Sequence, residues 1–148
     1  MPNVSNLKPV YRIIDANINR AKEGLRVCED IARFMLDSRG LVSGFKKARH
    51  RITAILKCLP VDTGLYEHRE SAGDVGRNIH INELRRDNWQ DIFYANMQRI
   101  KESVRVMEEF VKLINRNTAL KFKKLRYDIY GLEKDSAKKI SSYLRSRK

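Results

Sequence analysis

An internal repeat is the sequence feature that most constrains how this chain can fold. Residues 16–30 align with residues 95–109 at a constant spacing of 79, and eight of the fifteen aligned positions are identical. After a two-residue gap, residues 46–50 align with residues 123–127. Apolar residues in the first copy recur every three or four positions, which is typical of one buried helix face. The sequence therefore predicts two related helical hairpins, paired into a bundle with approximate two-fold symmetry.

The distribution of prolines and glycines predicts an all-α, four-helix domain. Prolines occur only at positions 2, 9 and 60, and no stretch alternates convincingly between apolar and polar residues. We expect helices over about 10–36, 41–59, 87–115 and 118–144. The 148 residues make one domain. Its parts are repeat one (about 10–59), a linker (60–85), repeat two (about 86–134) and a basic C-terminal extension (135–148).

Three local expectations accompany this division. Asp87 is expected to open the third helix with a capping box that includes Gln90. Ile31 and Phe34 lie partly off the apolar stripe, which predicts burial on more than one side of the first helix. Cys28 and the later Cys58 are too few and too far apart in sequence for a disulfide framework or a cysteine zinc site, so we expect reduced, mostly buried thiols.

Charge and composition narrow the classes of function. The formal net charge is +13, of which residues 135–148 contribute only +4, so the excess is spread through the domain. No apolar run approaches the ~20 residues that span a bilayer, and the N-terminus lacks the apolar core of a signal peptide, so we expect a cytoplasmic protein. Nucleic acid, an acidic membrane surface and small phosphorylated ligands all fit the positive charge.

The two copies of the repeat share their polar residues more closely than their apolar ones. Leu25 is replaced by Val104 and Cys28 by Met107, whereas the polar residues are retained. The retained set is Asn17, Arg20, Glu23, Arg26 and Glu29, matched by Asn96, Arg99, Glu102, Arg105 and Glu108. On a helical wheel Asn17 and Glu29 border the apolar face, so part of this set should be buried and need partners. Ordinary ion pairs along the helix surface are the alternative explanation.

The linker carries a second candidate cluster. Gly73 and Gly76 could free backbone N–H groups for a phosphate, with Arg69 beside them and Asp74 as a magnesium ligand. A simple turn is the alternative. The sequence contains neither a P-loop nor the protein-kinase motifs, and its three histidines lack metal-ligand spacing. Arginines and carboxylates without a marked nucleophile favour phosphoryl transfer, which depends on positioning and charge neutralisation.

The sequence resembles a small family of thiamine biosynthesis across about residues 10–134. The resemblance is carried by the motif of residues 12–34 and by Lys47–His50, Gly73–Gly76, Ala95–Asn96 and Leu125–Tyr127. Members occur alone or fused to the N-terminus of thiamine-phosphate synthase and are described as hydroxymethylpyrimidine phosphate kinases. The resemblance implies conversion of the monophosphate to the diphosphate, with ATP as phosphate donor and Mg²⁺. This chain departs from the family at Glu70 and Ser71, where Asp and Thr are expected.

The residue roles combine this resemblance with the chemistry of the side chains. The expected catalytic residues are Arg20, Glu23, Arg26, Arg99, Glu102 and Arg105. The expected substrate-binding residues are Asn17, Asn96, Arg49, His50, Arg69, Gly73, Gly76 and Arg126. The expected metal ligands are Asp74, Glu29 and Glu108. The pseudo-symmetry allows one half to bind ATP and the other half the acceptor.

Two other functions stay open at this stage. A basic helical nucleic-acid-binding protein fits the net charge, although its positive charges are interleaved with carboxylates and no binding motif is visible. A non-catalytic regulatory module of thiamine-phosphate synthase fits the resemblance. The expected partners are ATP and a small phosphorylated pyrimidine, with thiamine-phosphate synthase and a second copy of the chain as further candidates, and no membrane.

Overall fold

The computed structural model describes residues 7–60, 72–74 and 85–147, and its secondary structure is helical, as predicted. Four long helices form a bundle: α1 (Leu7–Asp30), α2 (Arg39–Leu56), α3 (Trp89–Val111) and α4 (Arg116–Ser146). A π-helical segment, η2 (Ile31–Met35), continues α1. Pro9 lies in the first turn of α1, where its missing N–H costs no hydrogen bond.

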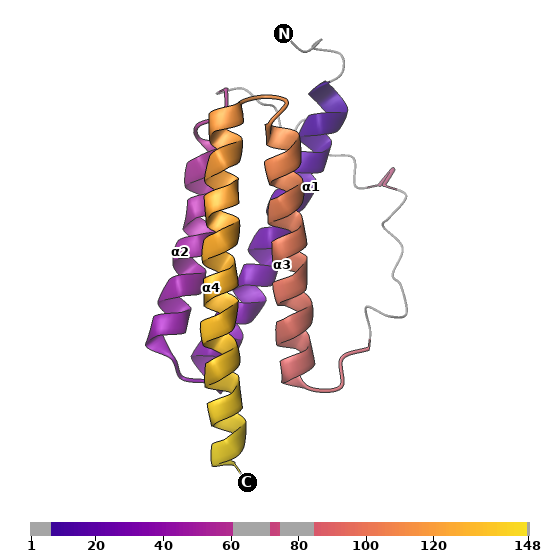
Figure 1. The fold of residues 1–148 in the computed structure, drawn as a ribbon. Helices are drawn as coiled ribbons and strands as arrows, with labels where there is room; N and C mark the ends of the chain where they lie inside the picture. The colour runs from indigo at the N-terminus through magenta and orange to yellow at the C-terminus, as the bar shows by residue number, and fades with distance from the viewer. Residues whose placement is uncertain (1–6, 61–71, 75–84, 148) are drawn as a thin grey trace.

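The helices form a ring in which each helix packs against two others. α1 contacts α2 and α3, and α4 contacts α2 and α3. In Figure 1, α3 and α4 lie in front of α1 and α2, and contacting helices run in opposite directions. A two-fold rotation that exchanges α1 with α3 and α2 with α4 preserves this arrangement. The structure thus confirms the architecture of two related hairpins predicted from the repeat.

Two contacts lie where the equivalent helices of the two hairpins meet. At the crossing of α1 and α3, a Cβ atom on Gly24 would lie 2.8 Å from Cγ1 of Ile100, so the glycine permits a close approach. On the α2–α4 side, Arg51 forms an ion pair with Asp128. These two residues occupy equivalent positions of the repeat, 77 apart. The pairing of equivalent positions is what a pseudo-two-fold axis between the hairpins requires.

The core is built from the apolar stripes of all four helices. Its largest fully buried side chains include Phe45 of α2, Phe93 of α3 and Phe122 of α4, and the rings of Phe45 and Phe93 meet edge to face at 6.2 Å. Side chains also cap three helix starts, since Ser38, Asn88 and Asn115 accept hydrogen bonds from the backbone three residues later. Asn88 is therefore the cap of α3, and the predicted capping box from Asp87 is wrong.

The first hairpin turns differently from the second, and this difference explains why Phe34 is not buried as expected. The α-helical hydrogen bonds of the first helix end at Asp30, and the π-helical turn that follows leaves Phe34 72% exposed while Ile31 is buried. The wider π turn changes the angle between successive side chains, so a helical wheel with 3.6 residues per turn misplaces Phe34. Of the two cysteines, Cys28 is buried as expected, whereas Cys58 is exposed.

Candidate functional site

A buried carboxylate lies between the two helices of the first hairpin. Glu29 of α1 is only 7% exposed and accepts two hydrogen bonds from Arg49 of α2, at 3.1 Å from Nε to Oε2 and 3.4 Å from Nη2 to Oε1. Arg26, one turn earlier on α1, adds a longer ion pair of 3.8 Å to the same carboxylate. The carboxylate is buried with two partners, as a buried charge requires.

The second hairpin repeats this arrangement. Glu108 of α3 is 4% exposed, and Nε of Arg126 on α4 donates to its Oε2 at 2.9 Å. Arg105 lies 3.6 Å from the other oxygen of Glu108. Arg126 also donates to the hydroxyl of Tyr130 at 3.0 Å; this bond, followed by the bond to Glu108, raises the pKa of Arg126. The duplicated polar residues therefore form two equivalent Arg–Glu–Arg clusters, one in each hairpin.

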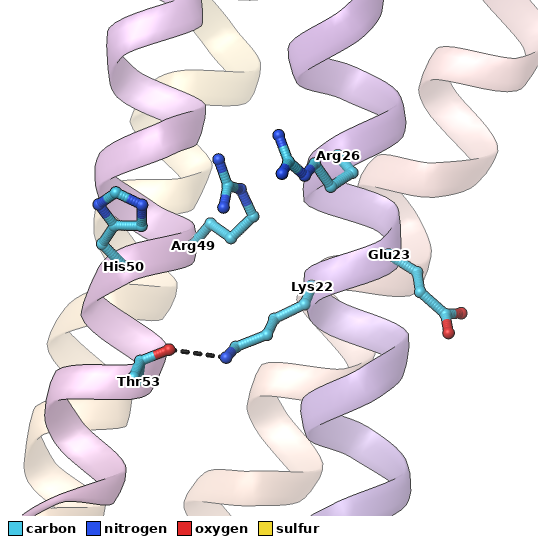
Figure 2. Close-up of a pocket in the computed structure, with 6 residues that line it drawn as sticks. All are labelled: Lys22, Glu23, Arg26, Arg49, His50 and Thr53. Atoms are coloured by element: carbon cyan, nitrogen blue, oxygen red, sulfur yellow. Dashed lines mark hydrogen bonds between the residues drawn. The ribbon is translucent and has the colours of Figure 1, made fainter.

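A hollow of about 240 Å³ opens beside the first cluster, between α1 and α2. We call it the α1/α2 hollow. Figure 2 shows Arg26 and Arg49 extending into the space between the two helices, while Glu23 points away from α2. Nζ of Lys22 crosses from α1 to donate to the hydroxyl of Thr53 at 2.6 Å. The hollow is lined by Lys22, Glu23, Arg26, Arg49, His50 and Thr53.

The environment of this hollow perturbs the ionisation of Lys22. Burial lowers the pKa of its ammonium group, and the positive charge of Arg49 lowers it further. Its hydrogen-bond partner, Thr53, is neutral and does not offset this effect. An anion bound in the hollow would favour the charged form of Lys22, so the ammonium is suited to meeting a phosphate.

A second hollow, of about 400 Å³, lies between α3 and α4 and is the counterpart of the first. We call it the α3/α4 hollow. Its lining residues are Gln98, Lys101, Glu102, Arg105, Val106 and Tyr130. Lys101, Glu102, Arg105 and Tyr130 occupy the repeat positions of Lys22, Glu23, Arg26 and Thr53. The two-fold relation of the hairpins thus extends to their hollows.

The two hollows differ in how far their cations are neutralised. In the α3/α4 hollow, Lys101 pairs with Glu133 at 2.9 Å and Arg105 pairs with Glu109 at 3.0 Å. In the first hairpin, Leu56 occupies the position of Glu133 and Asp30 occupies the position of Glu109. There Lys22 donates to the neutral Thr53, and Arg26 forms the 3.8 Å ion pair with Glu29. The α1/α2 hollow therefore retains more positive charge for an incoming anion.

The hollows face opposite sides of the bundle. In Figure 1, α3 and α4 lie toward the viewer, whereas Figure 2 looks onto α1 and α2 with the other two helices behind. The helix contacts agree, because the α1–α2 pair and the α3–α4 pair form opposite sides of the ring. Ligands held in the two hollows of one chain would be separated by the hydrophobic core.

Four further predicted site residues, Arg20, Arg99, Asn17 and Asn96, lie outside both hollows. Arg20 and Arg99 are exposed and do not line either one. Asn17 is buried, and its side-chain amide donates to the carbonyl of Ile13 at 2.8 Å. Asn96 makes the same bond to Ile92. The two asparagines therefore bond to the preceding turn of their own helices, which is a second duplicated feature.

The predicted linker and metal residues are only partly described. Gly73 lies in a turn at residues 72–73 and Asp74 follows it; both are exposed, whereas Arg69 and Gly76 lie outside the described residues. No group of three or more His, Cys, Asp or Glu side chains within residues 7–60, 72–74 and 85–147 could hold a metal ion. Glu29 and Glu108 are bonded to arginines, so neither is a preformed metal ligand. Within the same ranges, no helix combines the length and apolar character needed to cross a membrane.

Six residues that line the two hollows were not among the predicted candidates, and the repeat carried a signal for the two lysines among them. The six are Lys22, Thr53, Gln98, Lys101, Val106 and Tyr130. Lys22 and Lys101 are identical in the repeat at the spacing of 79, so the pattern that selected the arginines also contained these lysines. Thr53 and Tyr130 differ between the copies and carry no motif. Their places in the hollows follow from the register between α1 and α2 and between α3 and α4, which sequence spacing does not provide.

Comparison with known proteins identifies the family. The sequence profile of the ThiD2 family matches residues 12–135, which include all four long helices in whole or in large part. The chain belongs to the ThiD2 family. The thiamine-phosphate synthase of Nostoc punctiforme is 37% identical over 125 residues, covering 84% of this chain and 34% of that protein. The synthases of Synechocystis sp. and Prochlorococcus marinus AS9601 are 36% and 35% identical, and the matches cover 35% of each.

This ThiD2 chain spans about a third of the length of the curated relatives it matches. The synthase names describe those longer proteins. No solved structure matches the chain. The family assignment confirms the expected link to a family whose domain occurs in thiamine-phosphate synthases.

Proposed function

We propose that this chain is a cytoplasmic, ATP-dependent kinase of thiamine biosynthesis that converts hydroxymethylpyrimidine monophosphate to the diphosphate. The α1/α2 hollow carries the proposal, because a partly buried lysine and two arginines converge there around the buried Glu29. Family membership and the similarity to thiamine-phosphate synthases support the pathway. Both substrates are phosphorylated, so a cationic hollow attracts each of them.

The proposed reaction matches what these residues can do. An oxygen of the acceptor phosphate forms a bond to the γ-phosphorus of ATP while the bond from that phosphorus to the departing ADP oxygen breaks. A phosphate monoester is largely ionised at pH 7, since its second pKa is near 6, so its oxygen needs no dedicated base. Transfer then depends on holding the two phosphates in line and on stabilising negative charge, which are roles for Arg26, Arg49 and Lys22.

The buried Glu29 serves this chemistry indirectly. It holds the guanidinium of Arg49 through two hydrogen bonds, which fixes the direction of the remaining N–H groups toward the hollow. A positioned arginine loses less freedom when a phosphate arrives and stabilises charge without reorganising. We therefore assign Arg26 and Arg49 to phosphate binding and Glu29 to positioning.

Magnesium fits this arrangement as a partner of ATP. Mg²⁺ commonly binds proteins through one or two carboxylates and takes its other ligands from phosphates and water. Glu23 lines the α1/α2 hollow, and no ion pair joins it to a described arginine or lysine. Its carboxylate points away from α2 in Figure 2, so the side chain would have to turn toward the hollow to meet an ion held there by phosphates. We propose Glu23 as its protein ligand; the ion would offset charge on the phosphates.

The opposite placement of the hollows argues against one substrate in each half of a single chain. Phosphoryl transfer requires reacting atoms about 3–3.5 Å apart. Ligands in the α1/α2 and α3/α4 hollows would be on opposite sides of the core. Both substrates must therefore meet on one face, and the less neutralised α1/α2 face is the better candidate.

The alternative is a non-catalytic module that acts with thiamine-phosphate synthase. The observation that favours this alternative is that relatives carry the matching segment within chains about three times as long as the segment.

One assay separates the kinase from the non-catalytic module. Folded protein is incubated with hydroxymethylpyrimidine monophosphate, ATP and Mg²⁺, and the products are followed by ³¹P NMR. We expect ADP and the diphosphate to appear in equal amounts; the absence of turnover would leave the module as the better account.

A further inference from the structure

A third hollow, of about 450 Å³, lies at the turn of the first hairpin, outside the duplicated clusters. We call it the turn hollow. Three cations, one carboxylate, two hydroxyls and one apolar side chain line it, which gives a net charge of +2 from its side chains. These residues are Arg33, Asp37, Ser38, Arg39, Val42, Ser43 and Lys46.

The turn hollow is formed where the two copies of the repeat differ in length. Between Asp30 and Arg39 the first hairpin has eight residues, 31–38, whereas the second has six, 110–115, between the equivalent Glu109 and Arg116. The longer segment forms the π-helix η2 and places Asp37 at a φ of 49°. The insertion widens the turn and places Arg33 and Arg39 around a common space.

The cations of this hollow are not committed to carboxylates in the described part of the chain. Arg33 lies 5.2 Å from the ring of Phe34, and no ion pair joins Arg33, Arg39 or Lys46 to a described carboxylate. Their counterparts in the second hairpin are Lys112, Arg116 and Lys123, of which Lys112 pairs with Glu109 at 2.9 Å. The charge at the first turn is thus available to a ligand.

The turn hollow and the α1/α2 hollow share one face of the first hairpin. Lys46 lines the former and His50 the latter, and these residues are four apart on α2. Side chains at this spacing are neighbours on a helix surface, about 5–6 Å apart at Cβ. Two phosphorylated ligands could therefore lie end to end along this face, which the α1/α2 and α3/α4 hollows of one chain do not permit.

We propose that the turn hollow binds a phosphate group of a second ligand and that Arg33, Arg39 and Lys46 are its specificity residues. The presence of a second ligand rests on the proposed function, because that function requires two phosphorylated ligands on one face. The group that the turn hollow would bind is a phosphate. Either the acceptor monophosphate or ATP could supply this phosphate, and the experiment distinguishes these two ligands.

The second hairpin supplies a matched control for the test. The variant Arg33→Ala/Arg39→Ala removes two exposed cations of the turn hollow, and Lys112→Ala/Arg116→Ala removes the equivalent cations from the other hairpin. Inorganic phosphate, hydroxymethylpyrimidine monophosphate and ATP are each titrated by calorimetry, and backbone amide shifts of Ser43 and Lys46 are followed by NMR. Circular dichroism verifies that each variant is folded.

We expect the first variant to weaken binding of phosphate and of one of the two substrates at least about tenfold, and the control to leave both unchanged. The substrate that is affected identifies the natural source of the phosphate. Equal loss in both variants, or unchanged binding in the first, would overturn the proposal. Because binding is measured without turnover, phosphate binding with no kinase activity would refute the proposed function alone. Kinase activity with unchanged KM values in the Arg33→Ala/Arg39→Ala variant would refute this site alone.

Discussion

Arg49 of α2 donates to both carboxylate oxygens of Glu29 on α1, at 3.1 and 3.4 Å, and Arg126 repeats the interaction with Glu108 at 2.9 Å in the second hairpin. Each pair joins the two helices of its hairpin at an equivalent position. Both glutamates are almost fully buried. Arg49 also lines the α1/α2 hollow, whereas Arg126 is bonded to Glu108 and Tyr130. In the first hairpin the pair therefore connects the packing of the bundle to its candidate binding surface.

The first prediction concerns the stability of this pair. Replacing Arg49 by Met leaves the Glu29 carboxylate buried without its main partner and should lower the free energy of unfolding by about 3 kcal/mol. The double variant Arg49→Met with Glu29→Gln removes both charges and should recover part of that loss. Urea denaturation measures both values. Additive losses in the double variant would show that the two side chains are not coupled.

The second prediction concerns the close approach of α1 and α3. Gly24→Ala introduces a Cβ atom 2.8 Å from Ile100 and 3.3 Å from the carbonyl oxygen of Asn96, so it should destabilise the protein by about 1–3 kcal/mol. Gly131 on α4 is the matched control, since a Cβ there meets nothing within 4 Å. Gly131→Ala should stabilise the protein by about 0.5–1 kcal/mol. Thermal or chemical denaturation tests both, and a stabilised Gly24→Ala variant would contradict the crossing geometry.

The third prediction concerns the ionisation of Lys22. Its pKa lies below the ordinary 10.5, because of burial first and of Arg49 second. A lysine whose pKa is lower in the folded than in the unfolded protein makes stability rise with pH between these two pKa values. Lys22→Met should remove that rise. Titration of the Lys22 side chain by NMR should show the lowered pKa, and Arg49→Ala should raise it only in part, since burial remains. An ordinary pKa in the wild-type protein would be inconsistent with the hollow as described.

The fourth prediction separates the two cysteines by reactivity. Cys28 is fully buried, its pKa is raised chiefly by burial, and its thiol faces the carbonyl oxygen of Phe93. Cys58 is exposed and lies 3.1 Å from Nζ of Lys121. A thiol reagent should modify Cys58 rapidly in the native protein and Cys28 only after unfolding. Mass spectrometry of the labelled peptides identifies the site, and rapid labelling of Cys28 would show that the core opens there.

The repeat made the architecture predictable, because two similar amphipathic segments can bury their apolar faces by pairing. It also selected Glu29, Arg26 and their counterparts. The pairing of Glu29 with Arg49 depends on how α1 and α2 are aligned, which spacing within one helix does not determine. The exposure of Phe34 could not be predicted either, since the two-residue gap in the repeat did not reveal that the extra length would form a π-helix.

The measurement that tests the central claim most directly compares Arg26 with its counterpart Arg105. Each arginine lines one of the two related hollows and pairs with the buried glutamate of its own hairpin. Steady-state assays with hydroxymethylpyrimidine monophosphate, ATP and Mg²⁺ give kcat/KM for Arg26→Ala and Arg105→Ala. We predict a loss of about a hundredfold or more for Arg26→Ala and less than about threefold for Arg105→Ala, because phosphoryl transfer is assigned to the α1/α2 face. Equal losses, or a larger loss for Arg105→Ala, would contradict that assignment.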